Sequence, residues 1–335
     1  MASCKACGNT LAITIGAVVG LVLAAALLLL LLYKVGHCCL SRERKEQLLR
    51  TWRDFNLGVK LKILIATYQV ATKIGSVYEV DMPPAVAELL SYFRLVVSIG
   101  ISDISTPLQC LGLDGYASAL AFWMIMPFVL TLLIVLVAIG FVHCQRRFTL
   151  SVLELALPPV LRLFFLIYPL VTSVAFDAFP CYDFADGSRW LKADVSIACD
   201  SQSYVEVVRP LAWAAICLYP VGLLVLNASL LLYARKAIVT QQPTVLSKAI
   251  DFLHQEYEPC IYWWELVEML RRFILVGLMV VVYNGKMLQL QLGTLIATML
   301  LFFQVQAAPF RAMSDDFLGA AASFSLLIMF LCSIR

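Results

Sequence analysis

Charged residues are scarce in this sequence, and their scarcity excludes several classes of protein. Only 14% of the 335 residues are Asp, Glu, Lys or Arg, whereas 62% are hydrophobic. A water-soluble domain normally carries about 25% charged residues. The net charge of +3 also supplies no strongly basic surface for nucleic acid. The composition therefore predicts an integral membrane protein whose main partner is the lipid bilayer, with no nucleic-acid partner.

Histidines and catalytic motifs are also scarce. The three histidines, His37, His143 and His254, are far apart in the sequence. The sequence contains no glycine-rich phosphate loop, no HExxH motif and no GxSxG motif. Motifs of these kinds hold phosphates, zinc and nucleophilic serines. The sequence therefore predicts no enzyme, no metal site and no bound cofactor.

Long runs without charge are abundant, and they predict membrane-spanning helices. Leu11–Tyr33 has 23 consecutive uncharged residues, and a span needs about 20. We expect an all-α fold, a polytopic transmembrane helical bundle of about eight spans. The expected spans are residues 11–33, 61–80, 116–142, 157–179, 208–233, 265–283, 287–306 and 317–334.

The basic residues predict how these spans are oriented. Eight of the 25 Lys and Arg residues lie between Lys34 and Lys62, and basic loops stay on the cytoplasmic side. The N-terminus is therefore expected outside. The expected segments are an outer tail (1–10), a first transmembrane helix (11–33), a basic cytoplasmic amphipathic helix (34–60) and a polytopic domain (61–335) with outer loops at 81–115 and 180–206. The basic helix either lies on the membrane surface or is a solvated linker.

The outer loop 180–206 is acidic and contains two cysteines, Cys181 and Cys199. Cys181 and Cys199 lie on the oxidising side in this orientation, so a disulfide between them would close the loop. The sequence predicts this bridge. The acidic residues would concentrate cations at an outer mouth, although surface solubility explains them equally well.

A polar stripe crosses the expected span 61–80. Gln69, Thr72, Lys73 and Ser76 follow the i, i+3, i+4, i+7 spacing of one helical face. A polar stripe on a membrane helix must face protein or water. These four residues are candidates for lining an ion path, and hydrogen bonding to a neighbouring helix is the equal alternative.

A charged cluster begins the expected span 265–283. Glu265, Glu268, Arg271 and Arg272 lie within two helical turns, directly after Tyr262, Trp263 and Trp264. Glu268 is placed to pair with Arg272 at i+4 and with Arg271 at i+3. We interpret the four charged residues either as an inner latch that couples to gating or as an interfacial anchor with satisfied ion pairs.

The order of several short motifs along residues 4–335 resembles a known membrane module. It is similar to the C-terminal transmembrane domain of large algal, oomycete and other protist proteins with cysteine-rich repeat ectodomains. That module is in turn similar to transient-receptor-potential (TRP)-like and polycystin-like channels, including fungal TRP-like proteins. The motifs are Lys62-Ile63-Leu64, Tyr68-Gln69-Val70, Pro83-Pro84, Cys110, Tyr168-Pro169, Phe179-Pro180-Cys181, Asp194 with Cys199, Tyr219-Pro220, Trp264-Glu265, Glu268, Arg271-Arg272, Gln291 and Pro309-Phe310.

The resemblance implies a cation-permeable, homo-oligomeric channel in the plasma or ciliary membrane. One feature departs from the TRP pattern. Asn284-Gly285-Lys286 is the whole connection between the sixth and seventh expected spans, too short for a pore helix and filter. A path would then run through a helical bundle or between subunits. A membrane-anchored sensory or adhesion receptor and a lipid scramblase or transporter are the alternatives, because fold does not imply function.

Overall fold

The computed structural model describes residues 55–78, 115–144, 152–282 and 287–333, apart from the side chains of Ser76 and Phe141. Several expected segments lie outside the described residues: the outer tail 1–10, the first transmembrane helix 11–33, most of the basic helix 34–60 and nearly all of the outer loop 81–115. The chain divides into two compact units. These units are residues 1–62 with 99–114, and residues 63–98 with 115–335.

The described part of the first unit is residues 55–62, which contain the start of helix α3 (Leu57–Val77). Asn56 adopts a φ of 47°, and its carbonyl accepts hydrogen bonds from the backbone nitrogens of Val59 and Lys60 at 3.0 and 3.1 Å. The Lys60 ammonium donates to the Phe55 carbonyl at 2.7 Å. The helix therefore begins at a turn that the chain makes at Asn56.

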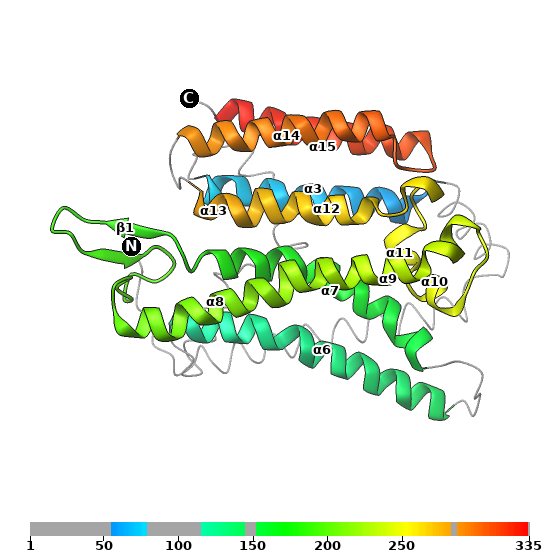
Figure 1. Ribbon diagram of the computed structural model, residues 1–335, viewed down its shortest axis with the longest axis horizontal. Coiled ribbons are helices and arrows are strands. Elements are labelled where there is room, and N and C mark those ends of the chain that lie inside the picture. The colour runs from blue at the N-terminus through cyan, green and yellow to red at the C-terminus, as the bar shows by residue number, and fades with distance from the viewer. Residues whose placement is uncertain (1–54, 79–114, 145–151, 283–286, 334–335) are drawn as a thin grey trace, which may run out of the picture. The chain divides into compact units, whose positions relative to one another are not determined.

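The second unit consists mainly of long helices (Figure 1). Within the described residues, five helical segments are long and apolar enough to cross a membrane: residues 116–140, 152–176, 204–239, 287–307 and 313–333. The chain is thus an integral membrane protein, as its composition predicts. The helices are α6 (Tyr116–Cys144), α7 (Val152–Phe176), α8 (Arg209–Ile216), α9 (Gly222–Val239), α10 (Val245–Ala249), α11 (Asp251–His254), α12 (Trp264–Arg272), α13 (Met279–Val281), α14 (Met287–Ala307) and α15 (Met313–Ser333).

Neighbouring helices in the sequence pack as hairpins. α6 packs on α7, and α14 packs on α15 (Figure 1). Tyr78, which follows α3, contacts two later segments of the chain. The Tyr78 hydroxyl donates to the Leu275 carbonyl, and its ring meets Phe330 of α15 edge-on at 4.9 Å. Gln289 of α14 donates to the carbonyls of Val77 and Met279. Polar side chains thus connect the helices by satisfying carbonyls within the apolar bundle.

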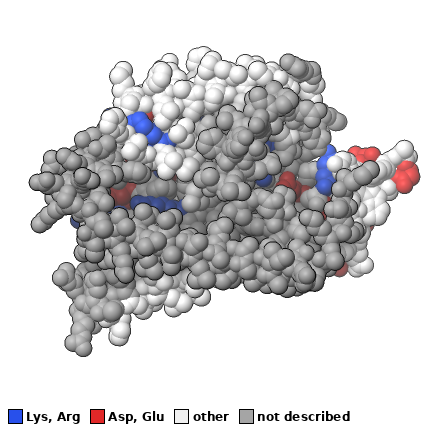
Figure 2. Space-filling model, turned by 180° about the vertical axis from the view of Figure 1, so that it is seen from behind, with Lys and Arg blue, Asp and Glu red and all other residues white. Residues whose placement is uncertain are grey.

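The outer faces of several helices are apolar. Val137 of α6 is 72% exposed, and Phe302 of α14 and Phe317 of α15 are 67% and 77% exposed. Among the described residues visible in Figure 2, most are neither basic nor acidic, and Lys, Arg, Asp and Glu form a few separate patches. Large exposed apolar surfaces in a monomer mark contact with another apolar phase. Here the helix lengths identify that phase as the lipid bilayer.

The expected all-α class misses a small β-sheet. Strands β1 (Cys181–Asp183) and β2 (Arg189–Leu191) pair antiparallel, with Tyr182 opposite Trp190. The connecting turn contains Gly187 with a φ of 81°, a conformation that glycine adopts without steric cost. Residues 180–199 are therefore an ordered hairpin rather than an irregular loop.

In the part of the chain that the structure describes, three π-helical turns are continuous with α-helices and interrupt their regular pattern. η1 (Tyr204–Val208) precedes α8, η2 (Cys217–Val221) joins α8 to α9, and η4 (Phe273–Leu278) joins α12 to α13. Pro220 lies inside η2, and proline removes one helical hydrogen bond. A single-turn π-bulge widens the helix locally and is common at functional sites.

Candidate functional site

One residue of the polar stripe of α3, Gln69, contacts α7. Gln69 is buried, and its Nε2 donates to the Leu166 carbonyl of α7 at 3.2 Å. The Thr72 hydroxyl bonds with the carbonyls of Tyr68 and Gln69, at 3.1 and 3.3 Å, within its own helix. The Gln69 Oε1 has no hydrogen-bond partner among the described residues. The structure thus places Gln69 in a packed seam between two helices.

Lys73 continues this stripe toward the far end of α3. It is half-buried, and its ammonium interacts electrostatically with the Asp177 carboxylate just beyond α7. The side chain of Ser76, the fourth candidate, is outside the described residues. Lys73 thus lies close enough to Asp177 to interact with it at this end of α3.

The inner-latch candidates lie together on α12. Arg272 and Glu265 form an ion pair, with 3.3 Å between Nη2 and Oε1, and each side chain is 1% exposed. The Tyr257 hydroxyl donates to the other Glu265 oxygen at 2.9 Å. The Arg272 guanidinium also lies 4.4 Å from the centre of the Phe165 ring. Several contacts therefore stabilise a charge that burial would otherwise penalise.

A second ion pair lies on the neighbouring face of α12. Arg271 Nη2 and Glu268 Oε2 are 2.9 Å apart, with side chains 8% and 13% exposed. Arg271 Nη1 donates to the Ser323 hydroxyl of α15 at 2.9 Å, and that hydroxyl donates to Gln304 Oε1 of α14 at 2.6 Å. Gly319 of α15 leaves the space that the Gln304 amide occupies. The polar chain therefore runs from α12 to both helices of the α14–α15 hairpin.

The pairing differs in part from the one that sequence spacing indicates. Glu268 pairs with Arg271 at i+3, as expected. Arg272 pairs with Glu265, seven residues away, and its Nε donates to the backbone carbonyl of Glu268. Two full helical turns bring residues seven apart onto one face, so both long side chains can reach each other. The sequence reasoning missed Tyr257, Ser323 and Gln304, because their contacts depend on tertiary packing.

Side chains from three other helices, α7, α9 and α14, contact α12. The Tyr168 hydroxyl of α7 donates to the Met269 carbonyl at 3.1 Å. Asn227 of α9 is buried, and its Nδ2 lies 3.2 Å from the Met269 sulfur. Trp264, at the start of α12, is buried against Phe303 of α14, with 5.1 Å between ring centres. These contacts hold both ends of the charged cluster in place.

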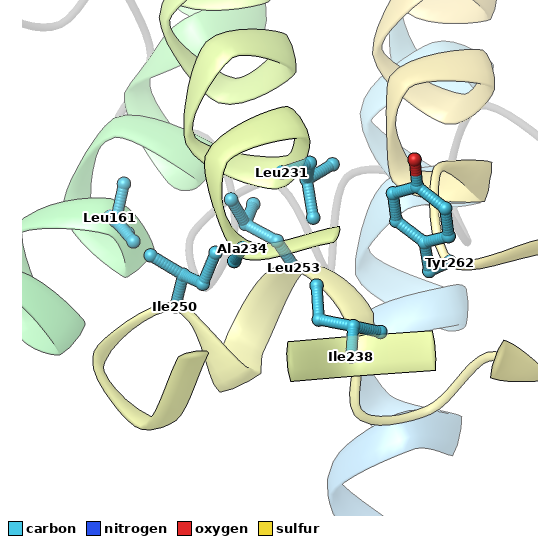
Figure 3. Close-up of a cluster of buried hydrophobic side chains, with 7 residues drawn as sticks. All are labelled: Leu161, Leu231, Ala234, Ile238, Ile250, Leu253 and Tyr262. Carbon is cyan, nitrogen blue, oxygen red and sulfur yellow. The ribbon is translucent and has the colours of Figure 1, made fainter. Parts of the chain in front are cut away.

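The connector after α9 folds back onto the bundle. Figure 3 shows a cluster of buried apolar side chains that joins α9 to the α10–α11 segment and to α7. Thr244 and Ser247 form a reciprocal capping box at the start of α10. The connector also bonds to the α14–α15 turn, because Glu258 N donates to the Pro309 carbonyl and Arg311 Nε to the Tyr257 carbonyl. The cluster consists of Leu161, Leu231, Ala234, Ile238, Ile250, Leu253 and Tyr262.

His254 is a titratable residue of the connector whose pKa is changed by burial. Burial lowers the pKa of His254, and the Ser247 carbonyl and Asp251 oppose this shift. Nε2 lies 3.1 Å from the Ser247 carbonyl, so it carries the proton of the neutral ring. Burial also raises the pKa of Asp251, which is 3.6 Å from the same nitrogen.

The hairpin contains a disulfide between Cys181 and Cys199, the bridge that the sequence predicts. Arg189 on β2 pairs with Asp183 at 3.0 Å and with Asp200 at 3.8 Å, all at exposed positions. Asp194 accepts from the backbone nitrogen of Tyr116 at 3.0 Å. This bond attaches the hairpin segment to the first residue of α6. Across the described ranges, no group of three His, Cys, Asp or Glu residues could hold a metal ion.

No protein-family model matches this sequence, and no curated protein or solved structure is significantly similar to the chain.

Proposed function

We propose that the chain is a cation-permeable, TRP-like membrane channel whose path runs through a helical bundle or a subunit interface rather than a TRP-type pore loop. The observation that carries this proposal is the presence on α12 of two ion pairs whose side chains are only 1–13% exposed. Ionisable residues at membrane depth are expensive, and they usually mark substrate or ion pathways and gating elements. A purely structural role needs no charge here, because an apolar core is often as stable.

The contacts of α12 support a role for its charged cluster as a latch. Arg271 connects α12 to Ser323 of α15, while Glu265 connects it to Tyr257 of the connector. The π-helical turn η4 follows directly after Arg272. Conversion of a π-turn to α-helix rotates the residues beyond it relative to those before it. Rotation of α12 would break its contacts with Ser323 and Tyr257 together, while the two ion pairs, which lie within α12, would turn with it. Contacts that are either made or broken give the latch two discrete states.

The number of spans and the setting are part of this proposal. α3 has 21 residues and the α12–α13 segment runs from residue 264 to 281, so they are about 31 and 27 Å long at 1.5 Å per residue. With residues 11–33, they bring the five apolar spans to eight, with the N-terminus outside. The channel would be a homo-oligomer in the plasma or ciliary membrane, and neither gate nor path would need a cofactor.

The decisive experiment is current recording from the purified chain in a planar bilayer, with cations exchanged across it and tension applied. The expected result is discrete, cation-selective conductance whose open probability changes in Glu268→Gln. Glu154→Gln, a carboxylate at the start of α7, is the matched control and should leave gating unchanged. Silence of well-folded protein across voltage, tension and calcium would overturn the proposal. Flipping of fluorescent lipids in vesicles without current would assign a scramblase instead.

A further inference from the structure

A cavity of about 140 Å³ lies among α7, α9, α11 and α12. Most of its wall is apolar, with Phe164 of α7, Leu226 and Leu230 of α9 and Phe252 of α11. Leu161 and Leu253 belong both to this wall and to the cluster in Figure 3. A cavity of roughly 150 Å³ lined by aliphatic and aromatic side chains binds benzene in another protein. The space is therefore large enough for one small organic molecule.

Two buried polar atoms in the wall of this cavity have no hydrogen-bond partner among the described residues, so they could recognise a polar group of a ligand. Asn227 Oδ1 and Arg272 Nη1 have no hydrogen-bond partner within the described part of the chain. The two residues are 7% and 1% exposed, and both line the cavity. The first atom requires a donor and the second requires an acceptor. A buried group left unsatisfied costs the free energy of its desolvation, so a molecule that satisfies both groups gains affinity.

The charge at this site is already balanced. The Glu265 carboxylate pairs with Arg272 and accepts from the Tyr257 hydroxyl. A carboxylate or phosphate ligand would add an uncompensated negative charge to a buried, neutral pair. An ammonium ligand would be repelled by the positive charge of Arg272, which lines the cavity. The local electrostatics therefore favour a neutral ligand with one group that both donates and accepts.

We propose that this cavity is a binding site for a small neutral alcohol or phenol, with one hydroxyl on an apolar body of about six carbons. The ligand hydroxyl donates to Asn227 Oδ1 and accepts from Arg272 Nη1, while the ring or short chain fills the apolar part. This binding proposal does not depend on the proposed channel function.

Binding is tested with the full chain in nanodiscs, using ¹⁹F NMR of 4-fluorophenol and 4-fluorotoluene. The two probes have similar shapes, and only the phenol carries the hydroxyl. Empty nanodiscs measure partition into lipid, which is subtracted. The expected result is one saturable site that binds the phenol about tenfold more tightly than the toluene, a ratio typical of a hydrogen bond to a charged group. Equal affinities would overturn the proposal, because they would show an apolar site that does not recognise the hydroxyl. Absence of saturable binding of either probe would also overturn it, because the cavity would then hold no organic ligand.

Three variants locate the site. Asn227→Leu removes the acceptor and should bring the affinities of the two probes within about twofold of each other. Val160→Phe places a ring in the cavity and should abolish binding of both. Val225→Phe is its matched control, because Val225 is on the lipid-facing side of α9 and 58% exposed. Unchanged phenol binding in folded Val160→Phe would contradict the location. If Asn227→Leu does not fold, the comparison of the two probes on the unaltered chain still tests whether the site recognises the hydroxyl.

Discussion

Glu265 and Arg272 form an ion pair in the interior of the bundle, and each side chain is only 1% exposed. The pair is supported on both sides, by the Tyr257 hydroxyl on the carboxylate and by the Phe165 ring under the guanidinium. Removing one member leaves the other as a buried, uncompensated charge. Removing one residue of the pair should therefore destabilise the fold by more than the intact pair stabilises it.

Arg272→Met should destabilise the chain by about 3–5 kcal/mol, the usual cost of breaking a buried ion pair. The double variant Glu265→Gln with Arg272→Met should lose less than the sum of the two single variants, because no unpaired charge remains. Thermal or SDS-induced unfolding of the reconstituted chain measures both effects. Arg235→Met, at an exposed position of α9, is the control and should change stability by less than about 0.5 kcal/mol. Additive losses would show that the pair acts as two independent charges.

Much of the helical arrangement follows from local sequence. The run from Tyr116 to Val142 is uncharged, and α6 covers it with two residues more. α14 begins at Met287, where the sequence predicts, and extends one residue further, to Ala307. Apolar length and the nearby charges are enough to locate such helices, because in a membrane each helix satisfies its own backbone. Chain order alone predicts these hairpins.

The candidate site was less predictable from the sequence. The i+3 pair of Glu268 and Arg271 depends only on helix geometry, and the sequence predicts it. The partner of Arg271 on α15, Ser323, is 52 residues away, and no local pattern marks it. The Asn227 side chain and the cavity beside it depend on how four helices meet. Contacts between helices far apart in sequence are set by packing, which periodicity does not encode.

Gly277→Ala should weaken the packing of η4 against α7. A Cβ at Gly277 would lie 2.7 Å from a Phe176 ring carbon and 2.9 Å from Thr172 Cγ2, so the helices must separate. Overpacking of this kind costs about 1–3 kcal/mol. Gly140→Ala is the matched control in α6, because a Cβ added there would have no atom of another segment within 4 Å. The control should stabilise the helix by up to about 1 kcal/mol. Unfolding of both variants under identical conditions gives the comparison, and equal effects would contradict the close contact.

Replacing both Cys181 and Cys199 by Ser should loosen the hairpin without unfolding the helices. The bridge joins residues 18 apart, and closing a loop of this length contributes about 3 kcal/mol to local stability. Limited trypsin digestion should then cut at Arg189 or Lys192 faster than in the unaltered chain. Cys217→Ser, at an exposed free cysteine of η2, is the control and should leave cleavage unchanged. Identical digestion rates for all three proteins would show that the bridge does not order the hairpin.

His254 should make the connector less stable in mild acid. Because burial lowers its pKa, the folded chain binds a proton less readily than the unfolded chain. Stability is then full above the usual pKa of about 6.5 and falls as the pH drops from there toward the folded value. His254→Gln should remove this part of the pH dependence between pH 8 and 5.5, measured as the midpoint of thermal unfolding. Asp251→Asn controls for the neighbouring carboxyl, whose raised pKa has the opposite sign and acts at lower pH. A pH profile unchanged by His254→Gln would contradict the prediction.

Lys73→Gln should increase cation current if the seam between α3 and α7 belongs to the path. The Lys73 ammonium lies at the end of this seam near Asp177, and a positive charge there repels permeating cations. At an effective dielectric constant of 20, a unit charge 10 Å away contributes about 1.7 kcal/mol, so conductance should rise by about two- to tenfold after screening. Lys248→Gln makes the same change of charge at an exposed position of α10 and should leave single-channel conductance unchanged. Equal conductance of folded Lys73→Gln and the unaltered chain would place the path away from α3, at a subunit interface.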